Sequence, residues 1–551
     1  MHTLESQIDT SGDEYRQNRA YMQGYVDKVR AVENKQLETE LAYRSRAQEK
    51  GKLLPRERLS RLLDPGAPFL ELCSIAGFGM FDDSDGRFSG GKLIAGIGYI
   101  ARRRVLVIVW NYAIKGGTID SVNVRKMLRL QDIAFRTKLP VVSLHESGGG
   151  NLEKSAALDP WGAALFVDGG RIYGQQAELS AAGIPQITVS HGNATAGGAY
   201  QVALSDYIVL VRNQTQLFLA GPPLLKAGTG EDASAEELGG AEMHATLSGT
   251  GEYLAENDAD ALRIAREIVA QLPADPLLPH RLPHNGQPIE APLYDPDELL
   301  GIFPEDRRKP VRAQEIIARV VDGSRFDEFN AAWDAATVCG IARIGGKQVG
   351  IISNNGPITP AGANKASQFI QLCDQKLTPL VFLQNTTGFL VGTEVERSGQ
   401  VKHSAKLIQQ VANCKVPKLT VLVGNSYGAG NYAMASRALK PEFVVSWPSA
   451  RQALMGGAQA GRVMQIVTEQ KWKRSGVEPD EKMRAQLDGQ SKMIQMGLEM
   501  ISESMFCSAR LMDDGIIDPR DTRRVLSFLL DVCLEARLRR VQPLSYGAQR
   551  L

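Results

Sequence analysis

The feature that most constrains this chain is a long internal duplication. A proline-led apolar run is followed by GNATAGGAY at 192–200, and a second such run is followed by GNSYGAGNY at 424–432. Gly, Asn, a later Gly and a final Tyr hold the same places in both loops. Earlier in each half, Pro140 precedes VVSLHESGG and Pro379 precedes LVFLQNTTG. A repeat of this length predicts a duplicated domain and not a solenoid of short units.

Strand-like and helix-like segments alternate in both halves, which predicts the α/β class with buried, largely parallel strands. At 551 residues the chain is too long for one ordinary core. Residues 1–60 are predicted to form a helical extension because charged residues alternate there with apolar ones at helical spacing. The stretch 286–311 is rich in proline and acids and is predicted to be a linker. The two domains are then 61–285 and 312–551.

Composition limits the function classes. The net charge is +1, so no global charge favours nucleic acid or an anionic membrane. The longest apolar runs have the length of strands, and the first residues are polar and acidic, so we expect neither a membrane span nor a targeting segment. Six cysteines without a CxxC pair indicate reduced thiols. We therefore predict a cytoplasmic protein, or a protein of the mitochondrial matrix if the source is eukaryotic.

The two glycine loops are free of acids, bases and thiols. A strand, a glycine loop and a helix in succession direct unpaired backbone N–H groups at one point, and the helix dipole adds positive potential there. Such a turn can hold a phosphate or the oxyanion of an enolate or tetrahedral intermediate. The alternative is a tight turn in which glycine only lets helix and strand pack closely.

Two other motifs compete with this interpretation. GNSYG at 424–428 matches a nucleophile elbow with Ser426, but that fold needs a histidine later in the chain, and the last one is His403. GAGNYA at 428–433 resembles a dinucleotide fingerprint, but its glycines come too long after the strand. The histidines are scattered, so no metal site is predicted. His145 and His191, at strand ends, are interpreted as hydrogen-bonded structural residues.

Five segments together resemble the carboxyltransferase (β) subunit of biotin-dependent acyl-CoA carboxylases. The resemblance covers roughly 20–540 and is strongest to the 3-methylcrotonyl-CoA and geranyl-CoA carboxylase types, which use the forms YGAGNY and WPSAR. These segments are the two glycine loops, GPPLLKAGTGEDASAEELGGAEMH at 221–244, PLVFLQNTTGFLVGTEVE at 379–396 and WPSARQALMGGAQA at 447–460.

The resemblance implies a fold of two tandem crotonase-like domains, each a ββα superhelix, and a carbon–carbon bond-forming ligase. In the family, biotin carries CO2 to the enolate of an acyl-CoA and takes up its proton, so two oxyanions form. Backbone N–H groups of Gly197 and Gly198 should then hold the thioester oxygen, and those of Ala429 and Gly430 the biotin oxygen. The domain 61–285 is the implied acyl-CoA side.

The resemblance also supplies further site residues and partners. Biotin-side candidates on the domain 312–551 are Thr387, Gly388, Phe389 and Tyr432. The chain has no Met-Lys-Met, so biotin should reside on a partner α subunit with biotin carboxylase and biotin carrier functions. The family also implies a homo-oligomer built from dimers, with a hexamer expected. The acyl-CoA-side candidates are Lys115, Gly116, Gly117, Ser147, Gly148 and Gly149.

The sequence departs from the family in two places. It reads ESGGG after His145 where DSGGA is usual. In RIYGQQ at 171–176, Gly174 stands where methylcrotonyl-type members usually carry bulky aromatics, which predicts space for a longer acyl chain. The alternative is a glycine required by helix packing. Two other functions stay open: a biotin-dependent decarboxylase subunit using the same loops in reverse, and a non-catalytic CoA-binding subunit.

Overall fold

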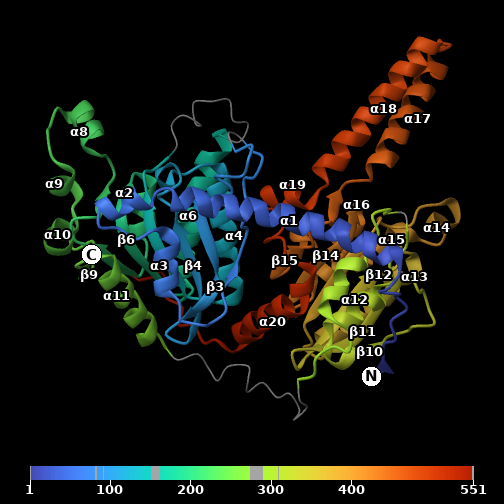
Figure 1. Cartoon of the computed structure of the whole chain (residues 1–551), viewed down its shortest axis with the longest axis horizontal. Coiled ribbons are helices and arrows are strands. Elements are labelled where there is room, and N and C mark those ends of the chain that lie inside the picture. The colour runs from blue at the N-terminus through green and yellow to red at the C-terminus, as the bar shows by residue number, and fades with distance from the viewer. Residues whose placement is uncertain are drawn as a thin grey trace. The chain divides into compact units, whose positions relative to one another are not determined.

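The computed structural model describes residues 2–80, 83–90, 92–150, 162–273, 289–307 and 309–548 (Figure 1). The chain divides into two compact units, which we call the N-terminal unit and the C-terminal unit. The N-terminal unit comprises Arg30–Leu282, Ala509–Leu511 and Val532–Leu551. The C-terminal unit comprises Met1–Val29, Pro283–Ser508 and Met512–Asp531.

This grouping by contact differs from the boundaries that the sequence predicts. Residues 1–29 group with the C-terminal half, and residues 532–551 group with the N-terminal half. The predicted boundaries followed composition along the chain, whereas the units follow packing. Three helices contain residues of both units: α1 Asp13–Leu41, α19 Ser504–Ala509 and α20 Thr522–Leu538.

The N-terminal unit contains a sheet in the order β2-β3-β4-β5-β6-β7-β9, with β8 beside β6. β3 and β4 are antiparallel, and β5, β6, β7 and β9 continue the sheet in parallel. The strands are β2 Leu70–Glu71, β3 Leu93–Ile100, β4 Arg103–Trp110, β5 Val141–Ser147, β6 Gln186–Thr195, β7 Tyr207–Val211, β8 Gln216–Phe218 and β9 Tyr253–Ala255.

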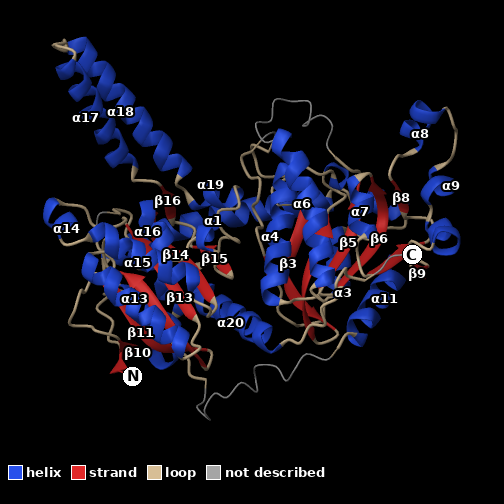
Figure 2. Cartoon of the chain, turned by 180° about the vertical axis from the view of Figure 1, so that it is seen from behind, coloured by secondary structure: helices blue, strands red, loops and turns tan. Residues whose placement is uncertain are grey.

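Helices cover this sheet, and α4 and α6 lie side by side across it (Figure 2). Helix α4 lies between β4 and β5, and its first turn is capped by the Asp120 carboxylate, which accepts from two backbone N–H groups. The helices are α2 Arg44–Glu49, α3 Pro55–Leu62, α4 Ser121–Thr137, α6 Gly162–Ala181, α7 Gly197–Ala203, α8 Pro222–Thr229, α9 Ala235–Gly239, α10 Ala241–Met243 and α11 Asp258–Gln271.

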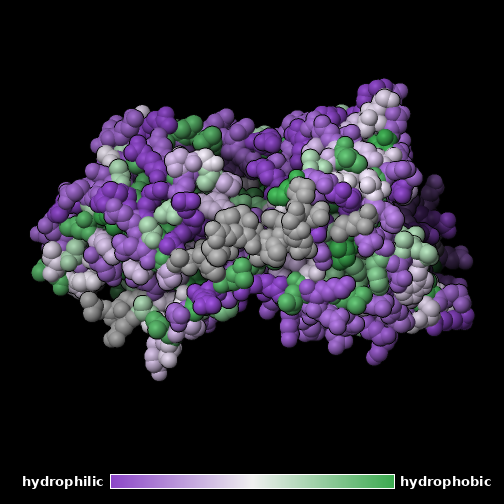
Figure 3. Space-filling view, turned by 90° about the horizontal axis from the view of Figure 1, so that it is seen from below, coloured by the Kyte–Doolittle hydropathy of each residue, from purple (hydrophilic) through white to green (hydrophobic). Residues whose placement is uncertain are grey.

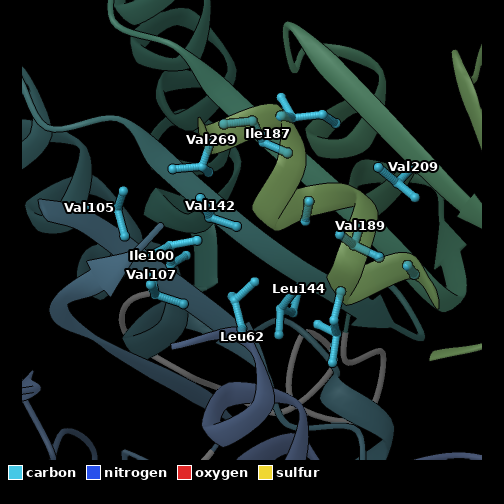
Figure 4. Packing of buried hydrophobic residues seen from close by; sticks show 14 of the residues in the cluster. Leu62, Ile100, Val105, Val107, Val142, Leu144, Ile187, Val189, Val209 and Val269 are labelled. Atoms are coloured by element: carbon cyan, nitrogen blue, oxygen red, sulfur yellow. The ribbon is translucent and has the colours of Figure 1, made fainter. Parts of the chain in front are cut away.

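The core of this unit lies between the strands and the helices α3 and α11. Branched aliphatic side chains such as Val142, Ile187 and Val189 project from neighbouring parallel strands toward Leu62 and Val269 (Figure 4). β-Branched residues suit such doubly covered strands because their stiff side chains pack well on a pleated surface. The packing fixes the strands whose C-terminal ends carry the first glycine loop.

The C-terminal unit repeats this architecture. Its sheet runs in the order β1-β10-β11-β12-β13-β14-β15, with β16 beside β14, and β12 to β15 are parallel. The strands are β1 His2–Thr3, β10 Arg325–Glu328, β11 Thr337–Ile344, β12 Lys347–Asn354, β13 Leu380–Thr386, β14 Lys418–Tyr427, β15 Phe443–Ser446 and β16 Arg451–Ala453. The helices are α12 Ala313–Val320, α13 Pro360–Gln375, α14 Thr393–Arg397, α15 Gln400–Asn413, α16 Gly428–Ala433, α17 Gly457–Arg474 and α18 Glu481–Ile501.

The predicted duplication is confirmed down to an irregularity in strand pairing. The register of β5 against β6 shifts between His145 and Ser147, and the register of β13 against β14 shifts between Gln384 and Thr386. These positions correspond in the two sequence halves. Within residues 1–60, where the sequence predicts a helical extension, α1 and α2 are separated by a turn in which Tyr43 packs on Tyr112.

The visible face in Figure 3 is mainly hydrophilic, with small scattered apolar patches. No helix among the described residues is long and apolar enough to cross a bilayer. The six cysteines, all within the described ranges, form no disulfide; five of them are buried and Cys414 is half-buried. Burial raises the pKa of Cys373 to about 12, so this thiol stays protonated.

Candidate active site

The first glycine loop joins β6 directly to α7. Ala196, between them, has a φ of 52°, a left-handed conformation that is costly for a residue with a side chain. Gly197 and Gly198 form the start of α7, and their N–H groups have no hydrogen-bond partner among the described residues. The loop therefore presents two adjacent amide donors from residues that carry no side chain of their own.

The second loop has the same geometry. Gly428, which corresponds to Ala196, has a φ of 57° and opens α16 directly after β14. Ala429 and Gly430 follow in the first turn, and within the described part of the chain no acceptor is found for their N–H groups. The two halves thus place matched pairs of amides at matched strand ends.

A close neighbour leaves little or no room for a side chain at one glycine of each loop. A Cβ atom added at Gly198 would lie 3.1 Å from the Nε2 atom of His145. A Cβ atom added at Gly430 would lie 2.8 Å from the Cα atom of Gly388, which is backbone and cannot turn aside. Both loops are therefore built on close approach of the chain, and the packing interpretation and the donor interpretation apply together.

The predicted acyl-CoA-side residues come together at the ends of β4 and β5. Lys115–Gly117 form a short 3-10 turn, and the Gly148 N–H donates to the Gly116 carbonyl at 3.0 Å. The Ser147 hydroxyl donates to the Gly117 carbonyl at 2.8 Å, and the Gly149 N–H donates to the Ser147 hydroxyl at 3.3 Å. A Cβ at Gly149 would lie 3.2 Å from the Thr195 carbonyl, which brings this cluster beside the first glycine loop.

Gly174 lies on α6, and nothing stands within 4 Å of the position where its Cβ would be. Helix packing therefore does not require this glycine. The preceding Tyr173 places its hydroxyl against Gly197 and its ring 5.7 Å from that of Tyr200. Burial raises the pKa of Tyr173, so its hydroxyl is a hydrogen-bond donor at neutral pH. Sequence reasoning did not single out Tyr173, because nothing in the motif indicates its direction.

The predicted biotin-side residues surround the second loop. Gly388, with a φ of 116°, lies directly against Gly430. Its N–H donates to the Thr386 hydroxyl at 3.2 Å, and its carbonyl accepts from the Ile358 N–H at 2.9 Å. Phe389 packs against the core of this unit. Thr387 and Tyr432 are exposed, Tyr432 by 40% of its surface.

A buried network of charges supports the first loop. Glu146 accepts from Lys52 at 2.6 Å and from Arg58 at 2.8 Å, and Arg58 also donates to Asp258 at 2.9 Å. His191 bonds the other oxygen of Asp258 at 2.7 Å. The sequence suggested none of these pairs, because their members come from four distant segments.

The network fixes the protonation of its members. Burial alone would raise the pKa of Asp258, but the hydrogen bond from His191 and the charge of Arg58 outweigh it and hold this pKa low. Burial and the Arg58 charge lower the pKa of His191, so its imidazole is neutral. Since ionised Asp258 can only accept, the Nδ1 atom of His191 carries the proton. The interpretation of His191 as a hydrogen-bonded residue is confirmed for its Nδ1 atom, whereas its Nε2 atom has no partner among the described residues.

His145 differs from that expectation. Its ring is 1% exposed and lies 5.1 Å from the ring of Trp110, yet its Nε2 atom has no hydrogen-bond partner among the described residues. Burial lowers the pKa of His145 to about 3, so the imidazole is neutral. The prediction that it is a hydrogen-bonded residue is wrong for this nitrogen, which lies 3.1 Å from the place where a Cβ atom at Gly198 would stand.

Ser426 is not an exposed nucleophile. Its side chain is fully buried, and its hydroxyl accepts a hydrogen bond of 2.6 Å from the Asn431 amide. The position corresponding to Ser426 in the first half is Ala194. The serine-hydrolase alternative therefore has no support in the geometry of this loop.

Comparison with known proteins agrees with the sequence motifs. The carboxyl transferase domain family matches residues 46–544. The geranyl-CoA carboxylase β subunit of P. aeruginosa is 51% identical over the whole of both chains, with a TM-score of 0.91. The 3-methylcrotonyl-coenzyme A carboxylase β1 subunit of Mycobacterium tuberculosis is 43% identical, covering 92% of this chain and 93% of its own.

A plant relative is equally extensive. The mitochondrial methylcrotonoyl-CoA carboxylase β chain of Arabidopsis thaliana is 40% identical, covering 99% of this chain and 91% of its own. The chain therefore belongs to the carboxyl transferase family and is a carboxyltransferase subunit of the biotin-dependent acyl-CoA carboxylases. The predicted fold of two tandem crotonase-like domains is confirmed.

Proposed function

We propose that this subunit carboxylates an acyl-CoA with a chain longer than methylcrotonyl, of the geranyl-CoA class. The observation that carries this is Gly174, an exposed position of α6 with open space where a side chain would stand, directly after Tyr173, whose hydroxyl lies against Gly197. The 51% identity to a protein titled geranyl-CoA carboxylase β subunit supports the same substrate class. A bulky side chain at 174 would fill the space that the longer chain needs.

In this proposal the two amide pairs stabilise two different oxyanions. The N–H groups of Gly197 and Gly198 hold the thioester oxygen as the acyl chain loses its proton and becomes an enolate. The N–H groups of Ala429 and Gly430 hold the oxygen of the biotin ring. Losing one such donor typically costs about 3 kcal/mol of barrier, or roughly a hundredfold in rate.

Biotin, on its partner subunit, supplies CO2 and accepts the proton, so no side chain of this chain has to act as the base. The absence of histidines, carboxylates and thiols from both loops fits that assignment. Around the second loop, Thr387, Gly388, Phe389 and Tyr432 are proposed to border the biotin ring. On the acyl side, Lys115–Gly117 and Ser147–Gly149 are proposed to border the thioester and the CoA.

The same reasoning assigns the partners. We infer an α subunit that carries biotin carboxylase and biotin, and a homo-oligomer built from dimers with a hexamer expected, in which the acyl side of one protomer meets the biotin side of another. We also infer a cytoplasmic location, or the mitochondrial matrix in a eukaryote, in keeping with six cysteines that form no disulfide among the described residues. The boundaries 61–285 and 312–551 stay our proposal for the two functional halves.

The test is labelled bicarbonate fixation by the chain together with its α subunit and ATP, over acyl-CoAs of increasing length. We expect the highest kcat/KM for geranyl-length substrates. The variant Gly174→Phe should shift preference toward methylcrotonyl-CoA by about 10- to 200-fold, the usual value of a pocket contact. Unchanged chain-length preference in Gly174→Phe would contradict the substrate assignment, and no fixation with any acyl-CoA would contradict the proposed reaction. Gly24→Ala, on α1 with open space around it, is the matched control.

A further inference from the structure

A cavity of about 170 Å³ lies behind the second glycine loop, within the C-terminal unit. Among the described residues, its lining contains two cations, Arg307 and Lys309, and no carboxylate. The polar remainder consists of three asparagine amides and one hydroxyl, which are Asn355, Asn385, Asn425 and Thr387. Such a lining is suited to an anion because every charged group in it is positive.

Arg307 is the central cation of this cavity. It is half-buried and donates to the Asn425 side-chain oxygen at 3.4 Å, to the Tyr21 hydroxyl at 3.3 Å and to the Ser449 carbonyl. All three acceptors are neutral, and in the described part of the chain Arg307 has no carboxylate partner. Lys309, by contrast, is exposed and pairs with Glu14 at 2.7 Å. A half-buried guanidinium without an anion is the unbalanced group of this region.

Two amide donors also face no acceptor. The side-chain oxygen of Asn385 accepts from the Asn425 N–H at 3.0 Å, and the side-chain oxygen of Asn425 accepts from Arg307. With both oxygens engaged, the two NH2 groups are left as donors, and no partner for them is found within the described ranges. Asn355 is different, because its oxygen and its NH2 group are both bonded within the protein.

The other half of the molecule identifies the missing group. Asn385 corresponds in sequence to Glu146, and both lie against the first glycine of their loop: a Cβ atom at Gly192 would overlap the Glu146 carboxylate, and one at Gly424 would overlap the Asn385 amide. At the first position the carboxylate neutralises Lys52 and Arg58. At the second, the neutral amide leaves Arg307 unbalanced beside a cavity.

We propose that this cavity binds a small planar oxyanion of the carboxylate class, either bicarbonate or an organic monocarboxylate. The oxyanion is held by Arg307 and by the NH2 groups of Asn385 and Asn425, and it does for the second loop what Glu146 does for the first. The volume suits a ligand of few heavy atoms, since a cavity of about 150 Å³ holds a benzene ring. The site does not depend on the proposed reaction.

The anion would also act on the second loop. Asn425 belongs to that loop, and Thr387 is adjacent to Gly388, against which Gly430 packs. Binding should therefore stabilise the segment that presents the Ala429 and Gly430 amides. Because the effect is on binding and stability, it can be measured without acyl-CoA or biotin.

The experiment uses the full chain, purified, in thermal unfolding and in 13C NMR with labelled bicarbonate and labelled acetate, at constant ionic strength set by chloride. We expect a saturable rise in Tm and broadening of the labelled carbon signal, beyond any effect of chloride. If bicarbonate has the lower Kd, the ligand is bicarbonate; if acetate has the lower Kd, the ligand is an organic monocarboxylate. Equal responses to bicarbonate, acetate and chloride would overturn the proposal.

Two variants locate the response. Asn385→Asp places an internal carboxylate beside Arg307 and should weaken anion binding about tenfold or more, while raising Tm in chloride alone. Arg307→Met should weaken binding by a similar factor. Arg263→Met, at an exposed arginine of α11, is the control and should respond like the natural chain. If Arg307→Met does not fold, Asn385→Asp alone tests the proposal, because aspartate has nearly the same shape as asparagine and should not disturb the fold. If Asn385→Asp binds the anions as tightly as the natural chain does, the site is refuted.

Discussion

The two glycine loops follow the same path, but what lies beneath them differs. Under the first loop, five charged or titratable side chains form a closed network centred on Glu146 and Asp258. Under the second, neutral amides and a cavity surround Arg307. Duplication has kept the backbone donors, which the chain itself supplies, while the supporting side chains have diverged. The donors define what both halves can do, and the supports define how each half is stabilised.

The largest expected effect comes from opening the network under the first loop. Glu146→Gln removes the carboxylate that balances Lys52 and leaves Arg58, which is 1% exposed, with Asp258 alone. Breaking a buried pair in this way costs about 3–5 kcal/mol of unfolding free energy. Denaturant unfolding measures it, with Glu267→Gln at an exposed pair on α11 as the control, which should change by less than about 0.5 kcal/mol. If Glu146→Gln also lowered the unfolding free energy by less than about 0.5 kcal/mol, a neutral amide would be tolerated beneath the first loop as it is beneath the second.

The next effect concerns the donors themselves. Gly430→Ala forces a Cβ to within 2.8 Å of the Gly388 backbone, and Gly198→Ala forces one to within 3.1 Å of the His145 ring, which can shift more easily. We expect kcat to fall about a hundredfold or more in Gly430→Ala, equivalent to about 3 kcal/mol, and less in Gly198→Ala. Bicarbonate fixation with the α subunit measures both. If both variants were as active as the natural chain, the glycine loops would not take part in catalysis.

A pH titration distinguishes the units through two buried aspartates. Burial raises the pKa of Asp513, in the C-terminal unit, to about 6 although Ser446 donates to it at 2.6 Å. The folded state therefore binds a proton between about pH 4 and 6 that the unfolded state releases, and stability falls by about 3 kcal/mol as pH rises through this window. Asp258 in the N-terminal unit has the opposite sign, because its lowered pKa gives stability that is lost as pH falls.

The variant Asp513→Asn tests this difference. It stays uncharged at every pH, so its stability relative to the natural chain should improve by about 3 kcal/mol between pH 4 and 7. Urea unfolding at several pH values measures the change. A constant difference across that range would show that Asp513 titrates normally.

The smallest effect comes from the matched asparagines of the two loops. Asn193 is exposed, whereas Asn425 bonds both Asn385 and Arg307. We expect Asn425→Ala to lower the unfolding free energy by about 1 kcal/mol and Asn193→Ala to change it by less than about 0.5 kcal/mol. Denaturant unfolding of both variants side by side measures this. Equal losses of unfolding free energy in the two variants would mean that the hydrogen bonds of Asn425 do not stabilise the second loop.

The sequence predicted the features that depend on local pattern. The strands, the helix α4 and the two loops follow from periodicity and from glycine spacing, and the resemblance gave the family. It could not predict the supports, because Lys52, Arg58, Glu146 and Asp258 are far apart in the chain and become neighbours only through packing. It also predicted a hydrogen bond for His145 that its Nε2 atom lacks, since burial of a ring does not reveal its partners.

The cysteines give each unit its own chemical label. Cys73 is buried in the N-terminal unit, and Cys339 and Cys373 are buried in the C-terminal unit. A thiol reacts as its thiolate, and burial suppresses both access and ionisation. Alkylation rates at these sulfurs should therefore report how often each half opens, so that mass spectrometry of one modified sample would tell which half of the enzyme comes apart first.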